Sequence, residues 1–145
     1  MPLVDLIDET FVVADRAALA ARVADRSEWG RWWPGLELSV TEDRGLKGVR
    51  WAVSGPLEGT SEIWLEPFSD GVILHYYLRA DPPGPRTGRA VDRRGERLRR
   101  RHALAWKRVV HALKDEMEAG RPPGVGRTRR TDVGEGAPRA PARRQ

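Results

Sequence analysis

Near its C-terminal end the chain carries a long run without proline, residues 92–119, which few folds can accommodate. Prolines and glycines border this run on both sides, at 82–85 and at 120–123. Because proline cannot continue a helix and glycine commonly follows the end of one, both borders predict helix termini. At about 100° per residue, one side of the run is apolar except for a histidine. The run therefore predicts one long amphipathic helix that needs a surface to cover its apolar side. That side consists of Leu98, His102, Ala105, Trp106, Val109, Val110, Leu113 and Met117.

Alternating residues upstream predict that surface as a sheet. Residues 3–13 are rich in Val, Leu, Ile and Phe and predict a first strand. Four later segments, at 36–41, 49–54, 62–66 and 72–79, alternate apolar and polar residues with a period of two. Short turn sequences separate these segments, which favours an antiparallel meander.

Between the first and second strands the sequence predicts two short helices. Asp15 is suited to cap a helix that has apolar residues at helical spacing over 16–24. Ser27 begins a second helical turn, which Pro34-Gly35 ends. Together the elements predict an α+β fold. A curved antiparallel sheet of about five to six strands wraps around a long C-terminal helix, with two short helices after the first strand.

Composition excludes several classes of site. The chain has no cysteine, so disulfides, thiolate nucleophiles and cysteine metal sites are excluded. Its three histidines are widely spaced and form no zinc motif, and no phosphate-binding loop or Gly-x-Ser-x-Gly motif occurs. No apolar run approaches the ~18 residues needed to span a bilayer, and the acidic N-terminus is unlike a signal peptide. We therefore expect a cytoplasmic protein with no metal, no cofactor and no membrane span.

The formal net charge of +5 is concentrated at the C-terminal end. Residues 120–145 hold seven arginines, two acidic residues and almost no apolar residue, so we expect them to form a disordered tail. The remainder, 1–119, is close to neutral and long enough to be one domain with its own core. The tail has no aromatic residue for base stacking, so sequence-specific nucleic-acid binding is not expected.

The segment around the two short helices is distinctive. Phe11-Val12-Val13-Ala14-Asp15-Arg16 leads into the first of them, and Asp25-Arg26-Ser27-Glu28-Trp29-Gly30-Arg31-Trp32-Trp33-Pro34-Gly35 follows it. With the order of elements, this segment resembles the helix-grip fold of the START-like, or SRPBCC, superfamily. Within it, the chain is similar to the small bacterial polyketide cyclase/dehydrase and lipid-transport family over about residues 3–120. Family members usually have six or seven strands, so any strand missing from our count of five would fall in 80–91.

The resemblance implies a cavity between the sheet and the long helix that binds an apolar small molecule, such as a lipid or a polyketide-like compound. Lipid carriers, hormone receptors and aromatase/cyclases belong to the superfamily. Three hypotheses follow. The chain is a START-like ligand-binding protein, a polyketide cyclase/dehydrase that positions a reactive chain for cyclisation and dehydration, or an adaptor with a filled core that binds an acidic partner.

Candidate ligand-binding residues are those that the predicted elements turn inward. His102 and Tyr76 are also the candidate catalytic residues, because together they would assist enolisation and loss of water. The alternative for His102 is a core histidine that hydrogen-bonds to a carbonyl or to the Tyr76 hydroxyl. Similarly, the cluster of Trp29, Trp32 and Trp33 either fills the core or lines the cavity mouth. The full candidate set is Trp33, Trp51, Tyr76, His102, Trp106 and Val110.

Other polar residues are assigned to the surface. Alternation turns Arg50 and Arg79 outward, and only a register shift of one residue would direct them toward a ligand carboxylate. We expect His75 and His111 to be exposed. Glu62 and Glu66 are expected to be ordinary surface charges.

The start of the long helix is rich in arginine, opposite to the charge that its macrodipole favours. An anionic partner at this end, such as a phosphate, a lipid headgroup or an acidic protein, would relieve the crowding. The alternative is a homodimer in which two such helices pair antiparallel, basic end on acidic end. Leu104 lies on the charged side and favours some contact there. The arginines are Arg93, Arg94, Arg97, Arg99, Arg100 and Arg101.

Overall fold

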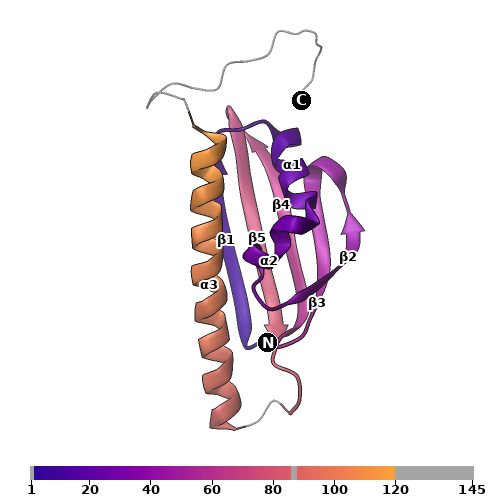
Figure 1. Cartoon of the computed structure of the whole chain (residues 1–145), viewed down its shortest axis with the longest axis vertical. Coiled ribbons are helices and arrows are strands. Elements are labelled where there is room, and N and C mark those ends of the chain that lie inside the picture. The colour runs from indigo at the N-terminus through magenta and orange to yellow at the C-terminus, as the bar shows by residue number, and fades with distance from the viewer. Residues whose placement is uncertain (1, 86–87, 120–145) are drawn as a thin grey trace.

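The computed structural model describes residues 2–85 and 88–119. Within them an antiparallel sheet packs against one long helix, α3, as Figure 1 shows. The α+β architecture expected from the sequence is therefore confirmed. The segment expected to be a disordered tail, 120–145, lies outside the described residues. Among the described helices, none is both long and apolar enough to cross a membrane.

The sheet has five strands in the order β1-β5-β4-β3-β2. Strands β2 to β5 form the expected meander, and the last strand, β5, also pairs antiparallel with the first strand, β1. A register irregularity between Val40 and Glu42 interrupts the β2–β3 ladder. The strands are β1 (Val4–Val12), β2 (Glu37–Asp43), β3 (Gly48–Ser54), β4 (Glu58–Phe68) and β5 (Gly71–Asp81). Five described strands agree with the count made from the sequence.

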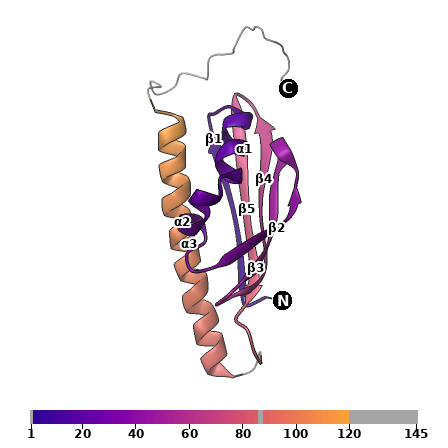
Figure 2. The same cartoon turned by 45° about the vertical axis from the view of Figure 1, so that its right-hand side comes forward.

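The two short helices form where the sequence predicts them. Helix α1 (Arg16–Ala24) begins after Asp15, whose carboxylate accepts a hydrogen bond of 3.2 Å from the Ala18 N–H. A 3-10 turn, η1 (Arg26–Glu28), leads into α2 (Trp29–Trp32). Both helices lie on the same side of the sheet as α3 (Figures 1 and 2). A second 3-10 turn, η2 (Gly45–Lys47), joins β2 to β3.

Helix α3 (Arg89–Met117) begins three residues before the position expected from the sequence. Gly88, with φ of 100°, turns the chain directly into it. The helix packs mainly on β1 and α2. Five of the eight residues of the predicted stripe are buried, together with Gly95, and Leu98, Ala105 and Met117 are half-buried. Between positions 89 and 101 only Gly95 is buried, so the first third of α3 extends beyond the sheet (Figure 1).

Aromatic side chains fill the space between the sheet and its three helices. All three tryptophans of the 29–33 segment are buried, with exposed fractions of 8%, 1% and 0% in chain order. This agrees with the expectation that they fill the core. Hydrophobic burial of about 1.5–3 kcal/mol per large side chain makes these rings a main source of stability.

Candidate functional site

The six residues predicted to line a cavity lie inside the molecule, between the sheet and α3. Trp51 comes from β3 and Tyr76 from β5, while Trp33 follows α2 directly. The other three come from α3. None is more than 1% exposed, so the structure brings the whole predicted set into one interior. The set is Trp33, Trp51, Tyr76, His102, Trp106 and Val110.

Four of these side chains are rings in contact with one another. Tyr76 stacks on Trp106, with ring centroids 4.1 Å apart and planes at 12°. Trp33 lies 6.1 Å from Tyr76 and 4.6 Å from Trp51. Trp32 adds an edge contact to Trp106 at 5.9 Å. The rings therefore form one continuous apolar cluster that joins β3, β5, α2 and α3.

Hydrogen bonds fix two of the rings in place. The Trp33 indole N–H donates to Ser61 Oγ at 2.9 Å, and Ser61 donates onward to the Tyr77 carbonyl at 2.6 Å. The Trp106 indole N–H donates to Asp8 on β1 at 3.0 Å, and Lys107 also bonds to this carboxylate. Burial raises the pKa of Asp8, but the bonds from Lys107, Trp106 and Thr10 outweigh it and leave that pKa lowered.

Three polar atoms of the interior have no such partner. Trp51 Nε1, the Tyr76 hydroxyl and His102 Nδ1 are buried and form no hydrogen bond with any described residue. Leaving a buried donor or acceptor unpaired costs about 1–3 kcal/mol, which is why most buried polar groups in proteins are hydrogen-bonded. All three atoms belong to the set of six predicted from the sequence.

The hydrogen bond between Tyr76 and His102, one of the alternatives left open by the sequence, is not formed. The Tyr76 ring stacks on Trp106, and its hydroxyl bonds to no described residue. That alternative was wrong, because inward alternation assigns two residues to one interior without fixing the direction of either polar atom. The alternative for His102, a core histidine satisfied at a carbonyl, does not hold for Nδ1 either.

The side chains of His102 and Tyr76 are both uncharged at neutral pH. Burial, with a smaller contribution from the charge of Arg101, lowers the pKa of His102 to about 4. Burial also raises the pKa of Tyr76, and the negative charge of Asp8 raises it further. The polar indole N–H of Trp33 partly opposes this by lowering the pKa. The interior therefore offers a neutral imidazole and a protonated phenol.

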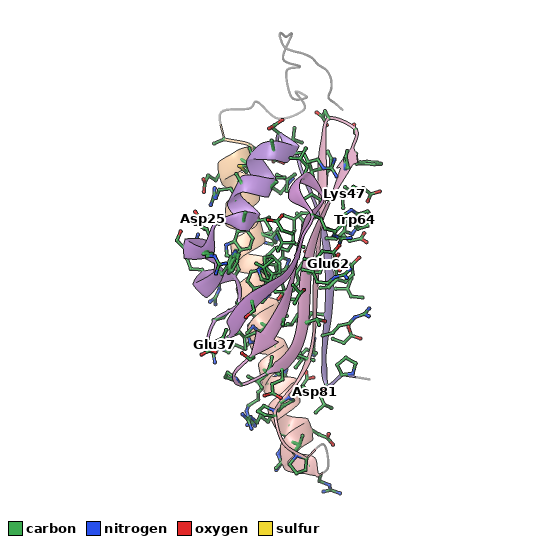
Figure 3. The ribbon with its side chains drawn as sticks, turned by 90° about the vertical axis from the view of Figure 1, so that its right-hand side faces the viewer. Asp25, Glu37, Lys47, Glu62, Trp64 and Asp81 are labelled. Carbon is green, nitrogen blue, oxygen red and sulfur yellow. The ribbon has the colours of Figure 1, made fainter. Side chains whose placement is uncertain are left out.

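The outer face of the sheet is different in kind. Arg50 and Arg79 point outward as expected, and their side chains are 44% and 55% exposed. Arg50 pairs with Glu42 at 3.3 Å and with Glu62 at 3.4 Å, and Arg79 pairs with Asp5 at 3.3 Å. Figure 3 shows Glu62 and Trp64 on the side of the sheet away from the helices. These arginines are therefore not available to an interior ligand.

The prediction that His75 is exposed was wrong. Only 5% of this residue is exposed. Its ring stacks on Trp64 at 4.3 Å, and its Nε2 lies 2.9 Å from Glu66. Alternation placed His75 on the outer face correctly. The burial depends on the β4–β5 register, which sets Trp64 opposite His75 and which no local pattern reveals. His111 is exposed as expected, and the described residues contain no cluster placed to hold a metal ion.

The arginines at the start of α3 divide into two groups. Glu96 accepts hydrogen bonds from Arg99 and Arg100, which lower the pKa of this carboxyl to about 2. The others form no ion pair with any described residue, and all of them are exposed. They are Arg93, Arg94, Arg97 and Arg101.

The acidic end of α3 is already engaged within the chain. Glu116 pairs with Arg22 of α1 at 2.5 Å. Glu118 accepts a hydrogen bond of 2.8 Å from the Val13 N–H and pairs with Lys114. These contacts compete with the antiparallel pairing of two α3 helices that the sequence left open.

Comparisons with known proteins identify the fold. No family model matches the sequence, and no curated protein matches it. Among solved structures, the chain is similar to the Aha1 dimer from Colwellia psychrerythraea, at 13% identity and a TM-score of 0.53 over 82% of this chain and 99% of that one. It is also similar to a polyketide-cyclase-like protein from Corynebacterium glutamicum, at 17% identity and a TM-score of 0.53 over 83% and 97%.

A third similar structure is a START superfamily protein from Mycobacterium smegmatis, at 12% identity and a TM-score of 0.51 over 75% of this chain and 98% of that one. At sequence identities this low, the structural similarity establishes the fold and leaves the activity open. The chain has a START-like helix-grip fold.

Proposed function

We propose that this protein binds an apolar small molecule, a lipid or polyketide-like compound, between the sheet and α3. One observation carries the proposal: three buried polar atoms without partners lie in an interior otherwise lined by aromatic rings. Ligand sites are mostly apolar with a few polar groups that fix orientation, and this interior has that composition. The similarity to START and polyketide-cyclase-like folds supports the same reading.

Binding requires rings that now touch to separate. The Tyr76–Trp106 stack joins β5 to α3, and Trp106 also bonds to Asp8 of β1. A ligand that enters between them replaces one ring–ring contact with two ligand–ring contacts. The polar atoms of Trp51, Tyr76 and His102 then orient it.

A cyclase/dehydrase is the alternative activity, and the proton chemistry favours binding over it. An imidazole with a pKa of about 4 is a weak base at neutral pH, and burial keeps the Tyr76 phenol protonated. The two groups also share no hydrogen bond. A cyclase would need the ligand itself to bridge them, so His102→Ala would then abolish turnover of a poly-β-ketone substrate without unfolding the protein.

A second function is favoured by the unpaired arginines of α3. We infer that Arg93, Arg94, Arg97 and Arg101 contact an acidic protein or another anionic surface, because like charges spaced four residues apart on a helix repel and these exposed arginines have no ion-pair partner among the described residues. The similarity to an Aha1 dimer makes a homodimer a further proposal. The mass of the native protein, measured at low and at high salt, tests both the anionic partner and the homodimer. A complex that depends on the arginines dissociates as the salt concentration rises.

Native mass spectrometry of the purified full chain tests ligand binding directly. We expect a discrete additional mass that leaves on denaturation. Trp106→Leu, inside the cluster, should lose the additional mass, whereas the matched outer-face change Trp64→Leu should retain it. A bare polypeptide mass that stays bare when apolar compounds are added would contradict the proposal and favour the adaptor hypothesis.

A further inference from the structure

The six interior residues carry no formal charge, and the charged side chain bonded to one of them is Asp8, which pairs with Lys107. Among the described residues, the buried polar side chains are those of Ser61, His75 and His102. His75 lies on the outer face of the sheet, beside Trp64. Ser61 is committed to Trp33 and to the Tyr77 carbonyl. His102 and Tyr76 are thus the buried titratable side chains on the inner side in the described part of the chain.

Cations near the interior are directed elsewhere. Arg50 and Arg79 point outward to carboxylates. Arg16, half-buried at the start of α1, donates to the Leu65 carbonyl at 3.0 Å. Lys107 pairs with Asp8, and Arg101, whose charge acts on His102, is exposed. A carboxylate brought among the rings would therefore lose its hydration beside the negative charge of Asp8 and without a buried cation, which is strongly unfavourable.

Two of the three unpaired atoms are hydrogen-bond donors that need an acceptor. An indole N–H can only donate, so Trp51 requires a ligand oxygen or nitrogen. A phenol that keeps its proton donates as well, so Tyr76 has the same requirement. The neutral imidazole of His102 donates at one nitrogen and accepts at the other.

The two donors belong to neighbouring side chains. The rings of Trp51 and Tyr76 both lie against Trp33, at 4.6 and 6.1 Å between centroids. His102 is one helical turn before Trp106, which stacks on Tyr76. A single molecule placed among these rings would contact several aromatic faces, and both donors belong to rings that lie against Trp33.

We propose, building on the binding function above, that the ligand is a neutral, planar molecule with at least one carbonyl oxygen, and that the site rejects carboxylates. Aromatic ketones and quinones meet these requirements. Fatty acids and other carboxylic acids, which are ionised at neutral pH, do not. The lowered pKa of His102 and the raised pKa of Tyr76 agree with this, because neither group supplies a charge at pH 7.

Three naphthalene probes of similar size test the proposal by calorimetric titration of the full chain at pH 7. They are 2-acetylnaphthalene, 2-ethylnaphthalene and 2-naphthoate, which differ only in the substituent. We expect the ketone to bind about tenfold more tightly than the hydrocarbon. The naphthoate should bind at least about a hundredfold more weakly than the ketone.

A matched pair of variants assigns the effect to the inner face. Tyr76→Phe should reduce the affinity for the ketone to that for the hydrocarbon, whereas Tyr77→Phe, on the outer face, should leave the order of the three probes unchanged. Equal affinities for ketone and hydrocarbon in the wild type would overturn the inference while the binding function stands. So would tightest binding of the naphthoate. If no probe binds, the binding function fails and the inference with it.

Discussion

The two faces of the sheet satisfy their polar groups in opposite ways. On the outer face, Arg50, Arg79 and His75 each lie within ion-pair distance of a carboxylate. On the inner face, Trp51 and Tyr76 hold polar atoms with no partner among the described residues. Buried atoms of the outer face that lack a hydrogen bond, such as Arg44 Nε, belong to ionisable side chains that already have an ion-pair partner. By contrast, Trp51 Nε1 and the Tyr76 hydroxyl have no hydrogen-bond partner among the described residues.

The largest difference between the faces is expected in the stability lost when a tryptophan is replaced by alanine. Trp106→Ala removes the stack on Tyr76, the contact with Trp32 and the hydrogen bond to Asp8, and we expect it to cost about 3–5 kcal/mol of unfolding free energy. Trp64→Ala removes a 36% exposed ring that stacks on His75 and should cost about 1 kcal/mol. Urea denaturation monitored by circular dichroism measures both. Equal losses would show that the inner cluster is no more tightly packed than the surface.

The next largest effect is a pH dependence that originates at His102. The folded protein holds the pKa of this group at about 4, against 6.5 for an ordinary histidine. Because the unfolded chain binds the proton at higher pH than the folded one, stability falls as pH is lowered from 6.5 to 4, by up to about 3 kcal/mol. Denaturant midpoints measured across this range should show a slope that His102→Leu reduces. An unchanged slope in that variant would assign the dependence to other groups.

On the inner face, we expect a smaller difference in stability between removing a hydrogen-bonded polar group and removing an unpaired one. Ser61→Ala leaves the Trp33 indole N–H without its acceptor and should destabilise the fold by about 1–3 kcal/mol. Tyr76→Phe removes a hydroxyl that already has no partner, so it should be neutral or stabilise the fold by about 1 kcal/mol. Thermal unfolding of the two variants side by side gives the comparison. A clear loss in Tyr76→Phe would indicate that its hydroxyl is bonded in the free protein.

The smallest effect is expected for ion pairs of the outer face. Arg79→Gln removes a pair with Asp5 that is largely open to solvent and should cost less than about 1 kcal/mol. Adding salt to about 1 M should abolish even this difference. A larger, salt-independent loss would mean that the outer face carries more of the stability than its exposure suggests.

Much of the fold could be predicted because two periodicities assign residues to faces. A period of two placed Trp51 and Tyr76 inside and Arg50 and Arg79 outside, and the helical period placed His102 and Trp106 against them. Proline and glycine located the ends of α3 to within about three residues. The six candidate residues came together because each belongs to the inward side of its own element.

What the sequence could not provide was the pairing of polar atoms across elements. The Trp106 indole bonds to Asp8, a residue 98 positions away in the chain. The Tyr76 ring stacks on Trp106, and its hydroxyl does not form the bond to His102 that the sequence left open. His75 is covered by Trp64 because of the β4–β5 register. Such contacts depend on distances between elements, and no local pattern in the sequence encodes them.

The most direct measurement is a titration of the ¹⁵N-labelled protein with 2-acetylnaphthalene, followed through the tryptophan indole N–H resonances. The resonance of Trp51, assigned with Trp51→Phe, should move downfield as its unpaired N–H gains an acceptor. The resonances of Trp29, Trp33 and Trp106 should move less, because these N–H groups already donate to Val23, Ser61 and Asp8. Shifts confined to the outer-face Trp64, or no shift at all at saturating probe, would contradict a binding site on the inner face.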